Sequence, residues 1–346
     1  MSGCVLFAWR RATPPFLIGG AEVSQRLLAE EFAEAGWQVI YLGAHEPPWD
    51  AAGEHEAMIT RLEGSCEYDF DHRSDVLGYV WRGVHCFAAP QAAISGLLGK
   101  LLATYSPDLV ITSQEGSADL AEAARSHAKV VGWLHSVSAT GTSVLQGGPH
   151  HALATSKFVL SHVQGRANAM LFYPPFSPCQ VNPSTRSDDL LMVNPVPAKG
   201  GELVRELAHQ LPHRRFTLVE GWWDTRAEYD LPNVAYLPRT EAMDSLYASH
   251  RLLLVPSTVP DAFPRVIIEA GLAGLGAIGA NVGGIPEAIA GAGMVLLPSD
   301  PMAWAAAIES LRASQLGKLG AAARTRALPL TRSCLPELVG AGIIAG

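Results

Sequence analysis

Several common signatures are missing from this chain. Its five cysteines are widely scattered and form no Cys-x-x-Cys pair, so the sequence signals neither a zinc ribbon nor a dithiol redox centre. Neither a Gly-x-Gly-x-x-Gly string nor a Walker loop is present, which removes support for the common dinucleotide and P-loop sites. No apolar run approaches the ~18 residues of a membrane-spanning helix, and the short apolar start precedes Arg10 and Arg11, the wrong polarity for a signal peptide. We therefore expect a cytoplasmic protein with reduced thiols and no integral membrane segment.

The chain also has fewer positively charged than negatively charged residues. The 25 lysines and arginines are outnumbered by 33 aspartates and glutamates, and the resulting net charge of -8 argues against a nucleic-acid partner. A local cationic pocket for a phosphate is compatible with this balance. The charged fraction of 17% and the hydrophobic fraction of 48% exclude a disordered chain, and 346 residues exceed what one core usually serves. Two domains are therefore expected.

Short apolar runs alternate with amphipathic helical stretches in both halves of the chain, the pattern of a parallel sheet covered on both faces. Strands are predicted at 5–9, 39–42, 76–81, 109–112, 130–134, 152–155, 190–193, 216–220, 234–236, 252–255, 277–279 and 294–297. Helices are predicted at 21–35, 92–105, 118–126, 157–164, 201–209, 241–248, 264–273, 286–289 and 302–311. We expect an α/β fold of two doubly wound, Rossmann-like domains facing across a cleft, with ligands at the carboxyl ends of the strands.

The domain boundary is expected where this alternation stops. Residues 171–178 are proline-rich and residues 182–189 are polar and without periodicity, so the region is interpreted as a linker. The expected divisions are an N-terminal domain over 1–180, a C-terminal domain over 190–320, and a tail over 321–346 that packs back on the first domain.

Two strings between strands and helices concentrate the candidate chemistry. Residues 19–22 read GGAE, where glycines let the backbone approach a phosphate at a helix start, although a tight turn alone gives the same pattern. Residues 256–270 follow a predicted strand and open a helix, with Asp261 in the loop and Glu269 about one turn into the helix. A second glycine loop follows at 281–287. The combination is hard to assign to packing alone.

These strings resemble the retaining family 4 glycosyltransferases of the GT-B fold. Members of that family carry two glutamates separated by seven residues in an EPFG…EA string, followed by GG(I/L)PE, and this chain reads DAFPRVIIEA and GGIPE. The resemblance extends over nearly the whole chain. The GGAE loop, PDLV at 107–110, His135 at a strand end, Lys199 before Gly200, and VPS at 255–257 all fall in family order.

The resemblance implies a role for each matching position. Glu269 is expected to hold the ribose hydroxyls of the nucleotide, Asp261 to face the donor sugar, and Lys199 to neutralise the diphosphate. His135 is expected near the reacting centre. The other donor-binding positions are expected in the N-terminal glycine loop, at the start of the C-terminal helix and at a second cation: Gly19, Gly20, Phe263, Pro264, Arg265, Val266 and Arg239.

Three positions depart from the family pattern. Asp261 replaces a glutamate, which shortens the side chain by one methylene, and Pro264 replaces a glycine, which removes one backbone donor. The strand end at 193–195 lacks the arginine that many members carry there, so Arg239 or Arg265 is a candidate for the second positive charge.

Two further features have a structural and a functional interpretation. Trp222 and Trp223 follow a predicted strand and are expected to pack at the cleft, with contact to the nucleotide as the alternative. His150 and His151 are interpreted as a surface pair, with ligand binding as the alternative.

The resemblance implies a retaining glycosyltransferase that moves a sugar from a nucleoside-diphosphate donor to an acceptor hydroxyl without a metal or other cofactor. UDP is the expected nucleotide, although members also use GDP, ADP and dTDP sugars. No basic amphipathic helix is evident near the N-terminus, which favours a saccharide or small natural product as acceptor. Two alternatives stay open: a GT-B epimerase acting on the same donors, and a non-catalytic nucleotide-sugar-binding protein.

Overall fold

The computed structural model describes residues 3–16, 19–45, 55–179, 186–240 and 242–346. The chain forms two compact units, one of Met1–Pro175 with Ser333–Gly346 and the other of Phe176–Arg332. The chain therefore returns to the first unit for its last residues. Residues 180–185, within the expected linker, and Glu241, at the expected start of a helix, lie outside the described residues.

The first unit is built on a nine-stranded sheet in the order β3-β4-β5-β2-β1-β6-β7-β8-β9. The strands are β1 (Cys4–Ala12), β2 (Gln38–Ala44), β3 (Tyr68–Asp71), β4 (Val76–Trp81), β5 (Val84–Ala89), β6 (Leu109–Ser113), β7 (Lys129–Leu134), β8 (His151–Ala154) and β9 (Ala169–Leu171). Neighbours from β5 to β9 pair in parallel, whereas β3-β4 and β4-β5 are antiparallel. The strand order reverses between β1 and β6.

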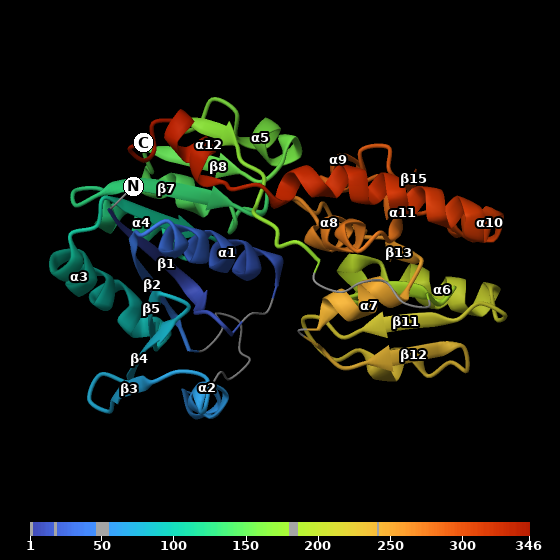
Figure 1. Ribbon diagram of the computed structural model, residues 1–346, viewed down its shortest axis with the longest axis horizontal. Coiled ribbons are helices and arrows are strands. Elements are labelled where there is room, and N and C mark those ends of the chain that lie inside the picture. The colour runs from blue at the N-terminus through green and yellow to red at the C-terminus, as the bar shows by residue number, and fades with distance from the viewer. Residues whose placement is uncertain (1–2, 17–18, 46–54, 180–185, 241) are drawn as a thin grey trace. The chain divides into compact units, whose positions relative to one another are not determined.

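Helices of the first unit connect these strands, and one of them comes from the far end of the chain. They are α1 (Gly20–Glu34), α2 (His55–Leu62), α3 (Ile94–Tyr105), α4 (Ser117–Ala124), α5 (Lys157–Val163) and α12 (Leu335–Gly340), with 3-10 helices at Gln91–Ala93 and Ser143–Gly147. Leu335 and Leu338 of α12 belong to the same core as Trp133 of β7 and Leu153 of β8, and Figure 1 shows α12 beside these strands. Burial of these leucines ties the C-terminus to the first unit.

Aromatic side chains fill the centre of this core. Phe7 of β1 stacks on Tyr41 of β2 with ring centroids 5.5 Å apart, and it meets Phe32 of α1 edge-on at 6.2 Å. All three rings are fully buried. Such large apolar groups anchor α1 over β1 and β2.

The second unit contains a six-stranded, fully parallel sheet in the order β12-β11-β10-β13-β14-β15. Its strands are β10 (Leu190–Val193), β11 (Phe216–Val219), β12 (Val234–Leu237), β13 (Leu252–Val255), β14 (Gly276–Ala280) and β15 (Met294–Leu296). The chain moves from β10 toward β12 and then, after crossing back to β13, toward β15. Right-handed crossovers place the helices of the two halves on opposite faces, so the order reverses between β10 and β13.

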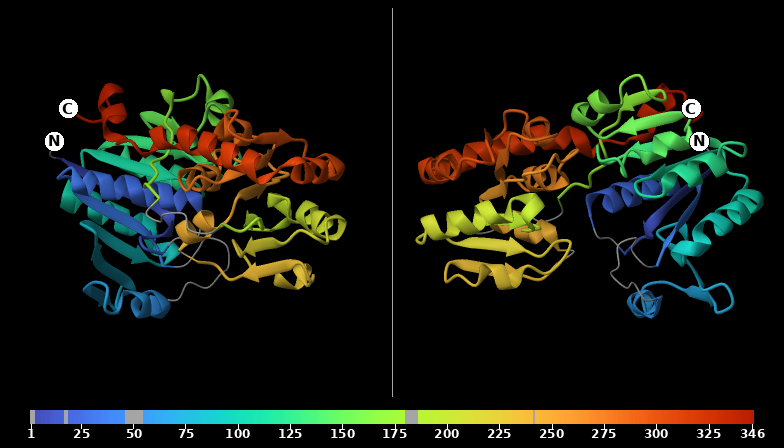
Figure 2. Two further views of the ribbon diagram at one scale, coloured as in Figure 1. Left: turned by 45° about the vertical axis from the view of Figure 1, so that its right-hand side comes forward. Right: turned by 180° about the vertical axis from the view of Figure 1, so that it is seen from behind.

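Both faces of this sheet are covered. The helices are α6 (Gly201–Gln210), α7 (Met243–Ser249), α8 (Arg265–Leu272), α9 (Ile285–Ile289), α10 (Pro301–Ser310) and α11 (Ala313–Ala327), with 3-10 helices at Pro197–Lys199, Arg226–Tyr229 and Leu328–Thr331. α6 packs against α10, whereas α8 packs against α7, α9 and α11. The long α11 runs beside α8 in both views of Figure 2.

The predicted α/β class with parallel sheets is confirmed. The helices and strands predicted in the second half correspond to elements of the structure, but α2, α11, α12, β3, β5 and β9 were not predicted. Among the described residues, no helix combines the length and the apolar character needed to cross a membrane.

Candidate functional site

Lys199 and Asp261 lie at the reversal of strand order in the second unit. Lys199 ends the 3-10 helix that follows β10, and Asp261 lies in the loop after β13. Because β10 and β13 are parallel neighbours, their carboxyl ends open at the same edge of the sheet. Ligands of doubly wound sheets bind in the crevice at this reversal.

The loops after β10 and β13 contact each other closely. The amide of Thr258 donates a hydrogen bond to the carbonyl of Ala198 at 3.1 Å. Gly200 has φ of +85°, and a Cβ there would overlap the carbonyl of Pro256. Glycine is therefore required at 200 for the left-handed backbone and for the close approach to Pro256. The two features hold the segment that carries Lys199 against the loop after β13.

The Lys199 ammonium and the Asp261 carboxylate form an ion pair through Oδ1 of Asp261. Oδ2 of the same carboxylate accepts a hydrogen bond from Ser257 at 2.7 Å. The side chains of Lys199 and Asp261 are 21% and 14% exposed, so solvent screens this charge pair only in part. Ser257 was not predicted as a site residue, although it stood in the VPS string.

The glycine loop after β14 supports the backbone of Asp261. The amide of Gly284 donates to the Asp261 carbonyl at 2.6 Å. Gly283 has φ of +60°, and a Cβ on either glycine would clash with the backbone at Asp261 or Ala262. These two glycines therefore position the carboxylate loop by backbone contact.

Glu269, the proposed ribose ligand, lies on α8 and is held by two side chains. Arg265, one turn earlier, donates from Nε to Oε1 at 3.0 Å, and Tyr247 of α7 donates to Oε2 at 3.3 Å. Burial, followed by the charge and hydrogen bond of Glu269, raises the pKa of Tyr247 well above its ordinary value. Tyr247 therefore stays a protonated donor to Glu269.

The start of α8 is packed rather than open. Pro264 is the N-cap of α8, Phe263 before it is buried, and Val266 lies in the first turn. The Arg265 side chain is only 7% exposed, and its guanidinium lies 4.2 Å from the ring centroid of Phe176. The structure thus pairs the Arg265 guanidinium with the Glu269 carboxylate and the Phe176 ring.

Trp222 contacts the lysine, and Arg239 is bonded to the loop that carries Trp222. The Lys199 ammonium lies 5.2 Å from the ring centroid of Trp222, in the loop after β11. The guanidinium of Arg239, which follows β12, donates to the carbonyl of Gly221. The sequence favoured simple packing for the tryptophans, so the contact between Trp222 and Lys199 was not predicted.

Gly19, Gly20 and His135 belong to the first unit, whereas Lys199, Asp261, Glu269 and the remaining predicted donor-binding residues belong to the second. Gly19 is the N-cap of α1 and Gly20 its first residue. His135 follows β7 and lies half-buried with its ring 4.6 Å from that of Trp133.

An unpredicted ion cluster occupies the strand-order reversal of the first unit. Arg11 at the end of β1 bonds Glu22 at 2.9 Å and both carboxylate oxygens of Glu115, at 2.7 and 3.0 Å. Burial alone would lower the pKa of Arg11, but the two carboxylates outweigh it and raise that pKa. Glu22, the glutamate of GGAE, is therefore a buried ion-pair partner that ties α1 to β1.

The histidine pair contributes to the backbone structure of the first unit. The Nδ1 atom of His150 accepts a hydrogen bond from the amide of Val130 at 2.9 Å, and His151 begins β8. Across the described residues, no group of three or more histidine, cysteine, aspartate or glutamate side chains is arranged to hold a metal ion.

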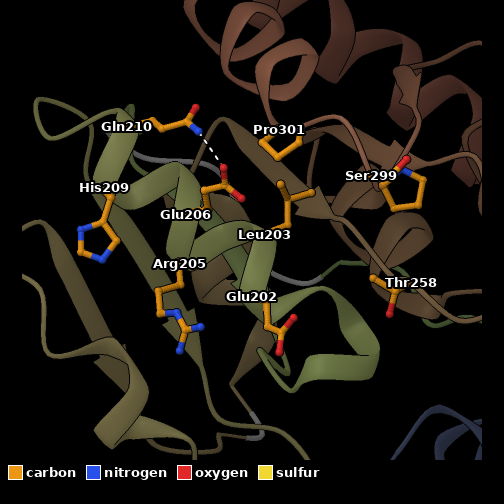
Figure 3. A pocket seen from close by; sticks show the side chains of 10 residues that line it. Glu202, Leu203, Arg205, Glu206, His209, Gln210, Thr258, Ser299 and Pro301 are labelled. Atoms are coloured by element: carbon orange, nitrogen blue, oxygen red, sulfur yellow. Dashed lines mark hydrogen bonds between the residues drawn. The ribbon is translucent and has the colours of Figure 1, made fainter.

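A surface hollow of about 650 Å³ lies along α6 in the second unit (Figure 3). Glu202, Glu206 and His209 of α6 line one side, with Ser299 and Pro301 opposite. Glu206 accepts a hydrogen bond from Gln210 at 2.9 Å. None of the predicted site residues lines this hollow, so the candidate chemistry lies elsewhere, at Lys199 and Asp261.

Part of the second unit is similar in sequence to a known protein family. Residues 202–314 match the family model described as Glycosyl transferases group 1. No curated protein matches the chain in sequence. The matched segment runs from α6 into α11 and includes Asp261 and Glu269, whereas Lys199 lies just before it.

Solved structures match almost the whole chain. Sucrose-phosphate synthase from Thermosynechococcus elongatus is 17% identical, with 99% of this chain and 98% of that chain covered and a TM-score of 0.74. HepE from Anabaena in complex with UDP-glucose is 17% identical, with coverages of 98% and 100% and a TM-score of 0.74. The catalytic domain of starch synthase IV from Arabidopsis thaliana, bound to ADP and acarbose, is 12% identical, with coverages of 94% and 96% and a TM-score of 0.68. The chain thus has the GT-B fold, and its residues 202–314 are similar to the group 1 glycosyltransferases.

Proposed function

We propose that this protein is a retaining, family 4-type glycosyltransferase that moves a sugar from a nucleoside-diphosphate donor to an acceptor hydroxyl. The observation that carries the proposal is the cluster of Lys199, Asp261 and Ser257 at the strand-order reversal, at the edge of the segment that matches the group 1 glycosyltransferases. A cation beside a carboxylate at this edge suits a ligand that is anionic at one end and rich in hydroxyls at the other.

The donor is proposed to be a UDP-sugar, and the acceptor a saccharide or small natural product. Among the structural neighbours, HepE was solved with UDP-glucose or with UDP and glucose, and starch synthase IV with ADP and acarbose. A nucleoside diphosphate is common to both. UDP is preferred because the neighbour with the higher structural similarity binds it.

In the proposed reaction, the bond between the sugar's anomeric carbon and the diphosphate oxygen breaks, and the diphosphate leaves with the electron pair. The acceptor oxygen attacks the anomeric carbon from the same face, and its proton passes to the leaving diphosphate. Lys199 opposes the charge that grows on the diphosphate, which is where preorganised electrostatics contribute most. Asp261 faces the sugar hydroxyls, Glu269 holds the ribose, and His135 acts near the reacting centre.

The proposal includes no metal cofactor, with Lys199 and backbone N–H groups meeting the negative charge. A cytoplasmic location is proposed on the basis of the cysteines, all five of which are free thiols in the structure. Thiols in this state are typical of reducing compartments.

The test begins with thermal-shift titrations of UDP, GDP, ADP and dTDP, which identify the base, followed by the sugars of the preferred nucleotide. Sugar transfer to a panel of hydroxyl acceptors is then measured, and NMR of the product determines whether the anomeric configuration is retained. Transfer with retention is the expected result. A donor that binds but stays intact indicates a binding protein, and a donor recovered with an inverted sugar centre indicates an epimerase.

A further inference from the structure

Trp222 and Trp223 form an exposed aromatic pair in the loop after β11. Their side chains are 41% and 52% exposed, and their rings lie 6.0 Å apart with an interplanar angle of 42°. Only one of the two meets the candidate site: in the described part of the chain, the Lys199 ammonium lies over Trp222, and no cation lies over Trp223. Trp222 therefore contacts a residue of the candidate site, whereas Trp223, in the same loop, serves as a comparison without that contact.

The peptide bond between Gly221 and Trp222 is anchored at both its carbonyl and its amide. The amide of Trp222 donates to Oδ1 of Asn194, at the end of β10, at 3.1 Å. The carbonyl of Gly221 accepts a hydrogen bond from Arg239, beyond β12. These two hydrogen bonds fix the backbone at the start of Trp222, from which the exposed ring contacts Lys199.

The ring and the carboxylate act differently on the same ammonium. Asp261 neutralises the charge of Lys199, whereas an indole face attracts the cation within about 6 Å and leaves its charge available. The lysine side chain is flexible, and it loses less conformational entropy when it binds a ligand if an aromatic face already restricts its ammonium. A ligand that displaces Asp261 would therefore meet a lysine that Trp222 still holds.

We propose that Trp222 is a positioning residue of the donor site, which holds the Lys199 ammonium where it meets the diphosphate of the nucleotide. This inference rests on the proposed function and adds a residue that is specific to the diphosphate. Because the ring acts through Lys199, its contribution is the same for every nucleobase. It is also present for inorganic pyrophosphate, which has no base.

The experiment is a calorimetric titration of the full chain with UDP, GDP and inorganic pyrophosphate. Trp222→Leu removes the aromatic face, Trp222→Phe keeps one, and Trp223→Leu is the matched control from the same exposed loop. We expect Trp222→Leu to weaken all three ligands by about 2–5-fold, the scale of an exposed cation–π contact. Trp222→Phe restores most of this affinity, and Trp223→Leu retains all of it.

A double-mutant cycle separates positioning from a general effect of the loop. In a Lys199→Met background, Trp222→Leu causes no further loss, because the ring has no ammonium to hold. In turnover, Trp222→Leu raises the donor KM and lowers kcat/KM, whereas Trp223→Leu changes neither.

Three results overturn the inference: a loss that spares pyrophosphate, which indicates a contact with the base; an equal loss in Trp223→Leu; and full additivity with Lys199→Met. A wild-type chain that binds neither pyrophosphate nor any of UDP, GDP, ADP and dTDP refutes the proposed function, and this inference falls with it. Wild-type binding of UDP with an unaffected Trp222→Leu variant refutes the role of Trp222 alone.

Discussion

Asp261 is the counter-ion of Lys199 in the structure, although the two residues were predicted to face different parts of the same ligand. The lysine proposed to meet the diphosphate is thus already paired, and the carboxylate proposed to face the sugar already has two partners, Lys199 and Ser257. If the proposed roles hold, a phosphate of the donor competes with the Asp261 carboxylate for the ammonium. Asp261 is thus a competitor of the free nucleotide.

Asp261→Asn is therefore expected to strengthen the binding of bare UDP. The uncharged amide competes less for Lys199, and the gain is about 2–5-fold, the scale of a partly exposed ion pair. The same variant binds the nucleotide sugar no better, because it loses an acceptor for sugar hydroxyls. Calorimetry with UDP and with the UDP-sugar measures both effects, with Glu202→Gln, at an exposed position of α6, as the control. Unchanged UDP affinity would contradict the competition.

Lys199→Ala is expected to lower kcat more than it raises the donor KM. The ammonium opposes charge that develops as the diphosphate leaves, so its interaction is strongest in the transition state. Removal of one such contact costs about 10²–10³ in rate. Steady-state kinetics with varied donor measure the split. Normal turnover would move the phosphate role to Arg239.

Glu269→Gln is expected to weaken nucleotide binding while the fold stays intact. The amide oxygen and nitrogen fill the same space beside Arg265 and Tyr247, but the carboxylate that the ribose hydroxyls require is gone. Glu269→Ala leaves the buried guanidinium of Arg265 without this carboxylate and costs about 1–3 kcal/mol in the free energy of unfolding. Calorimetry and urea unfolding distinguish the two variants. Equal UDP affinity in wild type and Glu269→Gln would remove the ribose assignment.

Glu115 is expected to make stability depend on acid pH. Burial alone would raise the pKa of Glu115, but the hydrogen bond and charge of Arg11 outweigh it and lower that pKa below its ordinary value of 4.5. The pair therefore stabilises the fold above that value, and the contribution is lost as the pH falls through the lowered pKa. Because this carboxylate is partly exposed, Glu115→Gln should cost only about 1 kcal/mol in the free energy of unfolding at neutral pH. The cost should decrease progressively in acid, where the wild-type carboxylate also becomes protonated. Urea unfolding at several pH values checks this, with exposed Glu122→Gln as the control.

Removal of divalent metals is expected to leave turnover largely intact. The proposed mechanism meets the diphosphate charge with Lys199 and backbone donors, so EDTA has no ion to withdraw from the reaction. Initial rates with EDTA, with added Mg²⁺ and with added Mn²⁺ are to be compared on the same preparation. A rate that depends on added metal would indicate a different class of glycosyltransferase.

Local patterns sufficed for most of the fold. Strands such as β10 and β13 are continuous apolar runs because a parallel strand is buried on both faces, and such runs are legible without tertiary information. β3 and β5 escaped prediction because exposed polar residues such as Asp69 and His85 interrupt them at the antiparallel margin of the first sheet. The short α12 was missed because its leucines have a core to enter only once it meets β7 and β8.

The residue types of the candidate site were also legible in the sequence, because a carboxylate, a cation and glycines at strand ends are a chemical pattern that needs no coordinates. What only the tertiary structure decided is which of them meet. Lys199 finds Asp261 because β10 and β13, which are distant in sequence, are neighbours in the sheet. Strand order comes from the packing of the whole unit, and no local segment encodes it. For the same reason the sequence placed Arg265 among the candidate cations and Trp222 in packing, whereas the folded chain pairs Arg265 with Glu269 and sets Trp222 against Lys199.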